Sequence, residues 1–137
     1  MDKKTYTGGC LCGSVRFSLS GPVDVVNCCH CSRCRRRTGS AYATIVHAAY
    51  SHFQFTEGEE NIVTFNPDGW NSRRFCGSCG SPLPGWDEED DEVGIPAGLF
   101  DEGLDVSPSL HIMTASKASW HEISGNIPQY EEFPDDW

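Results

Sequence analysis

The chain has 137 residues, of which 20 are acidic and only 10 are lysine or arginine, so its formal net charge is −10. Because nucleic acids and anionic membranes favour a basic protein surface, this charge argues against either as a general partner. The length fits one domain over residues 1–137, and no apolar run approaches membrane-spanning length. The N-terminus has no apolar signal segment, which predicts a cytoplasmic protein.

Alternating apolar and polar residues, rather than helical periodicity, dominate the chain. They predict strands at residues 15–19, 41–47, 53–55, 62–65, 93–95 and 110–114. The sequence NPDG after Phe65 predicts a turn, and one short helical turn is expected after Cys34. The sequence therefore predicts a mainly β fold of antiparallel sheets with little helix.

A run of acidic residues, Asp87–Glu92, stands between two of the predicted strands. It lacks the ligand spacing and the glycine turn of a calcium loop. We therefore expect a solvated loop there.

Eight cysteines in a chain without a signal segment indicate metal or redox chemistry, because disulfides are rare in a reducing cytosol. A secreted domain with four disulfides is the competing interpretation. It requires a lost signal peptide, and it tolerates the adjacent cysteines Cys28 and Cys29 poorly.

Two of the three cysteine groups form one predicted site. Cys76 and Cys79 have the spacing of a zinc knuckle, which supplies only two of the four ligands of a structural zinc. Cys10 and Cys12 lie in a similar glycine-rich segment and have no local partners. Joining the two pairs predicts a closed structural site of four thiolates.

The middle group, Cys28 to Cys34, contains four cysteines in seven residues. Three thiolates on one zinc leave the fourth position open, as catalytic zinc sites do. Spacing alone does not decide whether Cys28 or Cys29 joins Cys31 and Cys34. His30 is a candidate fourth ligand, but neighbouring side chains in an extended loop point apart, which favours a solvent-facing or supporting role.

Such a zinc is a poor Lewis acid for water, but it binds a second thiol and removes its proton. Arginines beside the site offset its negative charge and offer forks for carboxylates. Arg35 and Arg36 are therefore predicted to bind an acidic thiol such as glutathione, while Arg37 is expected on a solvated face.

Five segments together resemble the glutathione-dependent formaldehyde-activating enzyme family, which includes centromere protein V. The resemblance spans Gly8 to Pro134 and rests on GGCLCGSVRF, CHCSRCRRRTGSAY, RRFCGSCGSPL, HIMTASKASWHEI and IPQYEEFP. It implies a tent of antiparallel sheets pinned by a structural zinc, with two zinc ions per chain.

The resemblance also implies which residues bind and react. The structural zinc is expected at Cys10, Cys12, Cys76 and Cys79. The second, catalytic zinc is expected at Cys29, Cys31 and Cys34, which leaves Cys28 outside the motif. The implied activity is that of a carbon–sulfur lyase, in which glutathione or a related thiol adds to formaldehyde or another small carbonyl compound.

Two rival functions remain open from the sequence. One is a non-catalytic module that binds two zinc ions and a protein partner. The other is a single structural zinc combined with redox-active cysteines at positions 28 to 34. His111, in a predicted strand, is a candidate general acid or base but is more simply structural, and Trp120 is expected in the core or in a cleft wall.

Overall fold

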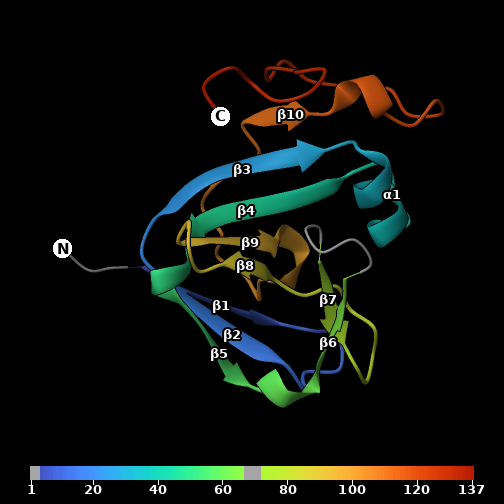
Figure 1. Cartoon of the computed structure of the whole chain (residues 1–137). Helices are drawn as coiled ribbons and strands as arrows, with labels where there is room; N and C mark the ends of the chain where they lie inside the picture. The colour runs from blue at the N-terminus through green and yellow to red at the C-terminus, as the bar shows by residue number, and fades with distance from the viewer. Residues whose placement is uncertain (1–3, 67–71) are drawn as a thin grey trace.

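The computed structural model describes residues 4–66 and 72–137 (Figure 1). One helix, α1, spans Ser32–Thr38, and the short 3-10 helices are η1 (Tyr50–His52), η2 (Glu59–Asn61), η3 (Ala97–Leu99) and η4 (Thr114–Ser116). The strands are β1 (Thr5–Gly9), β2 (Arg16–Ser20), β3 (Val23–Cys29), β4 (Ala43–Ala49), β5 (Phe53–Glu57), β6 (Ile62–Phe65), β7 (Arg73–Cys76), β8 (Gly85–Asp87), β9 (Glu92–Pro96) and β10 (Leu110–Ile112).

The described strands form three sheets. One has the order β1-β2-β5, the second has the order β10-β3-β4-β9-β8, and the third is the β6-β7 pair. All neighbouring strands are antiparallel except β10 and β3, which are parallel. In Figure 1, α1 lies at the end of β3 and β4, and the β6-β7 pair lies beneath it. The fold is thus mainly β, as the sequence predicts, with one parallel pair in an otherwise antiparallel sheet.

The main core lies between the three-stranded and the five-stranded sheet. Alternation along β2 buries Phe17 and Leu19, and alternation along β9 buries Val93 and Ile95. These side chains belong to one apolar cluster with residues of β1, β3, β4 and β5. Two smaller buried clusters contain the cysteines, so each cysteine group is packed into the fold rather than placed on a loose loop.

The predicted strands all occur, although their ends shift. The predicted helical turn is longer than expected and begins at Ser32, before Cys34 rather than after it. Gly39, with φ of 67°, ends the helix and donates its N–H to the carbonyl of Arg35 at 2.8 Å. The turn predicted after Phe65 falls mostly outside the described residues. None of the described helices is long and apolar enough to cross a membrane.

The predictions for the solvent exposure of the acidic run and of Trp120 have different outcomes. The acidic run forms the turn between β8 and β9 and is exposed, as predicted. Trp120 was expected in the core or a cleft wall, and this is wrong because 72% of it is exposed. It follows η4 in a segment without strand pairing, so no neighbouring sheet covers its ring.

Candidate metal centres

The first cysteine cluster connects the three-stranded sheet with the β6-β7 pair. Cys10 and Cys12 lie in the connection from β1 to β2, Cys76 is the last residue of β7, and Cys79 lies in the turn that follows. The four Sγ atoms are within 4.8 Å of one another. The predicted pairing of the two distant Cys-x-Cys and Cys-x-x-Cys segments therefore exists in the structure.

Sulfur separations in this cluster match those around a tetrahedral zinc. The Sγ atom of Cys12 lies 3.7 Å from that of Cys10 and 3.8 Å from that of Cys76. Zinc–sulfur bonds of about 2.3 Å in a tetrahedron place the ligand sulfurs about 3.8 Å apart. The residues thus fit a closed metal site without rearrangement.

Hydrogen-bond donors lie around this cluster and lower the pKa of Cys76 and of Cys79, which favours their thiolate forms. The Val15 N–H donates to Cys10 Sγ at 3.3 Å, and the Ser78 N–H donates to Cys76 Sγ at 3.4 Å. Hydrogen bonds from Ser81 lower the pKa of Cys79 to about 5. Deprotonated sulfur is the form that binds a metal, so this environment prepares the cluster for a cation.

The second cluster consists of Cys29, Cys31 and Cys34, with Sγ atoms within 4.8 Å of one another. Cys29 ends β3, Cys31 caps the N-terminus of α1, and Cys34 lies in its first turn. The Sγ atom of Cys31 accepts the Cys34 N–H at 3.3 Å, as an N-cap side chain does. The helix start therefore fixes the geometry of the cluster.

The three thiols influence one another strongly. Hydrogen bonds from Cys29 and Cys34 lower the pKa of Cys31 to about 2, and hydrogen bonds with Cys31 and Cys34 raise the pKa of Cys29. One sulfur thus carries negative charge easily, whereas three thiolates together need a cation. Among the described residues, the group that could hold a metal ion here consists of these three cysteines.

Cys28 does not belong to either cluster. Successive side chains of β3 point to opposite faces, so Cys28 points away from Cys29, and its Sγ lies 3.9 Å from Thr44 Oγ1. Both cysteines are buried.

We predict that Cys28→Ser leaves the metal content unchanged, because the residue has no place among the three clustered sulfurs. Metal analysis of the purified variant by mass spectrometry checks this. A lower metal content than in the wild type would show that Cys28 takes part.

His30 lies between two of the clustered cysteines but outside the cluster. It is fully buried, which excludes the solvent-facing alternative and agrees with the supporting role. The side-chain Nε2 of His30 lies 2.8 Å from Nδ1 of buried His111. The backbone N–H of His30 donates to the carbonyl of Ile112 at 3.1 Å. Burial, together with nearby His111, lowers the pKa of His30 to about 4, so His30 is neutral at pH 7. Burial also lowers the pKa of His111. The pair ties the cysteine loop to β10.

His111→Ala is expected to loosen the second cluster. The variant leaves His30 Nε2 buried without its hydrogen-bond partner, which costs about 1–3 kcal/mol of folding free energy. Because the cost falls on the loop that carries the cysteines, we expect the metal affinity of the second cluster to fall roughly tenfold. Competition with a chromophoric chelator measures the affinity of each zinc. We expect the four-cysteine site to be unchanged.

His47→Ala is the matched control, because His47 also bridges neighbours in the five-stranded sheet, contacting Asn27 and Glu92. It lies away from the cysteine loop. Equal zinc affinities in the two variants would contradict a specific role for His111 at the cluster.

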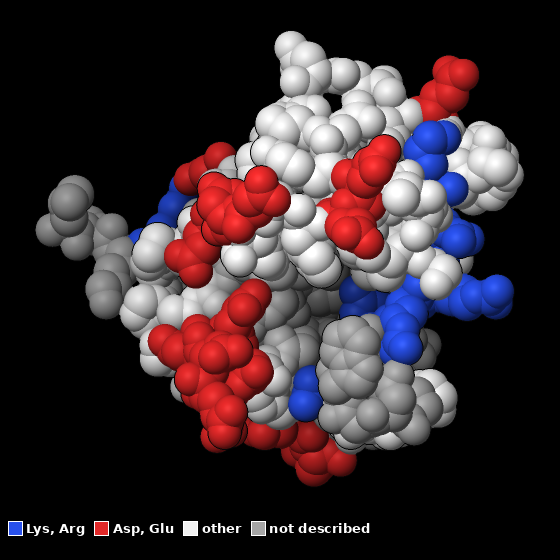
Figure 2. Space-filling view, turned by 45° about the horizontal axis from the view of Figure 1, so that its top comes forward, with Lys and Arg blue, Asp and Glu red and all other residues white. Residues whose placement is uncertain are grey.

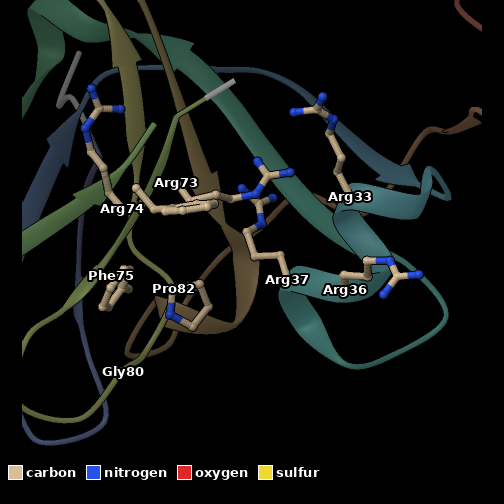
Figure 3. Close-up of a pocket in the computed structure, with 9 residues that line it drawn as sticks. Arg33, Arg36, Arg37, Arg73, Arg74, Phe75, Gly80 and Pro82 are labelled. Carbon is tan, nitrogen blue, oxygen red and sulfur yellow. The ribbon is translucent and has the colours of Figure 1, made fainter. Parts of the chain in front are cut away.

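An arginine-lined pocket of about 400 Å³ lies between α1 and β7 (Figure 3). Its arginines are Arg33, Arg36 and Arg37 from α1 and Arg73 and Arg74 from β7. Of the two predicted anchors, Arg36 lines this pocket, whereas Arg35 is half-buried and does not. Arg37, expected on a solvated face, is half-buried and also lines it.

Sequence reasoning missed Arg33, Arg73 and Arg74 as neighbours of Arg36. The repeat of arginine at positions 33, 36 and 37 was the available signal, since residues three and four apart share a helix face. Nothing in the sequence indicates that β7 faces this helix.

The chain matches known proteins in two comparisons. Residues 5–116 match the family model described as glutathione-dependent formaldehyde-activating enzyme. A crystal structure of a Rhodobacter sphaeroides protein, solved as a structural genomics target, is similar with a TM-score of 0.54 and 22% sequence identity. The match covers 90% of this chain and 98% of that chain, which shows a shared fold. With its cysteine clusters assembled and most of its length matched by the family model, the chain belongs to the glutathione-dependent formaldehyde-activating enzyme family.

Proposed function

We propose that the protein is a zinc-dependent carbon–sulfur lyase that joins a thiol to a small carbonyl compound and catalyses the reverse reaction. The thiol is glutathione or a related compound, and the carbonyl compound is formaldehyde or one of similar size. The observation that carries the proposal is the second cluster, which offers three sulfur ligands beside a pocket lined by arginines. Family membership supports the same chemistry.

In this proposal the two clusters have different roles. Cys10, Cys12, Cys76 and Cys79 hold a structural zinc, and Cys29, Cys31 and Cys34 hold a second zinc. When bound there, zinc supplies a coordination position at which a substrate thiol loses its proton. Three thiolates and Zn²⁺ carry a net charge near −1, which the arginines of α1 offset.

The chain's own residues bind and orient the thiol. Arg36 attracts its carboxylates from the pocket side, and Arg35 offers positive charge elsewhere on the same helix. The buried pair of His30 and His111 holds the cysteine loop in place. The substrate is thereby held with its sulfur at the cysteines and its carboxylates at the arginines.

The reaction balances without a further reagent. The substrate sulfur forms a bond to the carbonyl carbon, the electron pair of the carbon–oxygen π bond moves to oxygen, and that oxygen takes a proton. The thiol has released one proton, so thiol plus aldehyde gives the hydroxymethyl thioether. The reverse reaction breaks the same carbon–sulfur bond and restores the carbonyl.

Exchange spectroscopy by NMR tests the function on a mixture of zinc-loaded protein, glutathione and formaldehyde. We expect the adduct to exchange faster than in protein-free buffer at the same pH. A rate equal to that of buffer, with both metal sites occupied, would contradict catalysis on this pair and favour a non-catalytic zinc module.

A further inference from the structure

A second pocket, of about 210 Å³, adjoins the arginine-lined pocket and shares Arg37 and Pro82 with it. It lies where β4 begins and β9 ends, beside the last turn of α1, and Figure 1 shows these segments at the same end of the five-stranded sheet. We call it the β4–η3 pocket. Its lining includes Thr38, Tyr42, Ala43, Thr44, Ala97 and Gly98. This pocket has no role in the proposed function.

Two backbone neighbours place the β4–η3 pocket against the second cysteine cluster. Ala43 pairs with Cys29 in the β3-β4 register, and both side chains belong to one buried cluster with Cys34. The Thr38 hydroxyl donates to the carbonyl of Cys34 at 2.9 Å. The strand and the helix that carry the cysteines therefore also carry two walls of the pocket.

The Tyr42 ring is a third connection. Its centre lies 4.9 Å from that of the His30 ring, and His30 is buried between Cys29 and Cys31. Tyr42 and its neighbour Thr44 each bring a hydroxyl group to the lining. A few polar groups in an otherwise apolar pocket fix the orientation of a small ligand.

The β4–η3 pocket carries little charge. Figure 2 shows lysine and arginine gathered along one side of the molecule, and five of the chain's seven arginines line the neighbouring pocket. Among the described residues that line the β4–η3 pocket, Arg37 is charged and the others are neutral. Positive charge thus gathers next door, whereas the β4–η3 pocket suits an uncharged group.

Formaldehyde does not fill a pocket of this size. Formaldehyde has two heavy atoms, and one water molecule takes up about 30 Å³ in the liquid, so a pocket of about 210 Å³ holds several such groups. Small residues of η3 leave this space open. A Cβ atom added at Gly98 would meet no atom within 4 Å, and Gly98 does not have a positive φ. There is therefore room beyond a reacting carbon for a short carbon chain.

We propose that the β4–η3 pocket receives the substituent of the carbonyl compound, so that the protein prefers aldehydes with a short uncharged chain to formaldehyde. The inference rests on the proposed function for its reaction and adds the class of carbonyl compound. The step is unchanged: the sulfur–carbon bond forms, the carbonyl oxygen takes the proton that the thiol releases, and the chain is not altered. Each CH₂ group that leaves water for the pocket improves kcat/KM about fourfold.

Binding is measured first with amides, which resemble the aldehydes in shape but do not react with thiols. Formamide and butanamide are titrated into zinc-loaded protein, and the backbone chemical shifts of residues 42–45 and 96–98 are followed by NMR. We expect butanamide to give saturable shifts there at concentrations roughly tenfold or more below those of formamide. Gly98→Val fills the open space and is expected to weaken butanamide binding about tenfold.

Ala115→Leu is the matched control, because it adds three carbon atoms, as Gly98→Val does, to an exposed residue of another 3-10 helix, η4. Thr44→Val is a second test, since it keeps the side-chain shape and removes a hydroxyl, and it is expected to weaken butanamide binding about fivefold. Metal content and circular dichroism confirm that each variant is folded. Butanamide shifts that are absent, or that weaken equally in Ala115→Leu, would overturn the proposed pocket.

Substrate choice is measured next by the exchange assay, with glutathione as the thiol and formaldehyde, acetaldehyde or butanal as the aldehyde. Each rate is corrected for exchange in buffer. We expect kcat/KM for butanal to exceed that for formaldehyde roughly tenfold or more, and this ratio to fall in Gly98→Val but not in Ala115→Leu.

The outcomes of this assay separate the inference from the proposed function. Equal kcat/KM values for the three aldehydes, or an unchanged ratio in Gly98→Val, would overturn the inference and leave the proposed reaction standing. Butanamide binding without exchange of any aldehyde would support the pocket and contradict the proposed reaction.

Discussion

Cys76→Ser protein is expected to bind one zinc ion in place of two and to unfold at a temperature lower by roughly 10 °C. Cys76 is buried at the end of β7, and its Sγ lies 3.8 Å from that of Cys12. A metal held there fixes the β1–β2 connection to β7, which restricts the unfolded chain over a long loop. Mass spectrometry counts the zinc, and calorimetry measures the transition.

Cys28→Ser is the control for this effect, because it makes the same change at another buried cysteine. We expect it to keep two zinc ions and most of the wild-type stability. A chelator strong enough to remove both ions should lower the wild-type transition at least as far as the serine variant. Wild-type stability in Cys76→Ser protein with one zinc would contradict a structural role for this site.

Cys31→Ser protein is expected to lose the second zinc and to exchange the glutathione adduct at the rate of buffer, while remaining folded. Cys31 is at once a cluster ligand and the N-cap of α1. Serine is a preferred N-cap residue, so the substitution keeps the helix start and removes only the thiolate. Zinc content and the NMR exchange rate are measured on the same sample.

Cys31→Ala separates the two roles of this residue. Alanine removes the N-cap of α1 as well as the thiolate. We therefore expect Cys31→Ala protein to be about 1 kcal/mol less stable than Cys31→Ser protein, with the same loss of the second zinc and of adduct exchange. Wild-type exchange by Cys31→Ser protein that holds only the structural zinc would show that the second cluster is not the reacting site.

Much of the fold was predictable because its signals are local. Alternation along residues 15–19 and 93–95 marks the buried faces of β2 and β9. Four strands, β1, β3, β7 and β8, were not predicted. β3 carries Asn27, Cys28 and Cys29, buried in succession, so no alternation appears at the end of this strand. Its neighbours β4 and β10 cover both of its edges.

The parallel pairing of β10 with β3 could not be read from the sequence. It joins residues more than eighty positions apart, and no local pattern records which strand a short segment such as Leu110–Ile112 will pair with. This pairing brings His111 to His30 and buries both. The exposed position of Trp120 has the same origin, because only tertiary packing decides whether a neighbour covers a ring.

The sequence by itself determined the ligands that a single turn can bring together. Cys-x-Cys and Cys-x-x-Cys spacings place the sulfurs within each segment close through local backbone geometry. The joining of Cys10 and Cys12 with Cys76 and Cys79 was predicted from the four ligands that a structural zinc needs and from the family resemblance. Only the tertiary structure decided what surrounds them: His30 is buried against β10, and Arg73 lies near Arg37. These contacts join segments far apart in the chain, and the fold as a whole, not any local pattern, sets their distances.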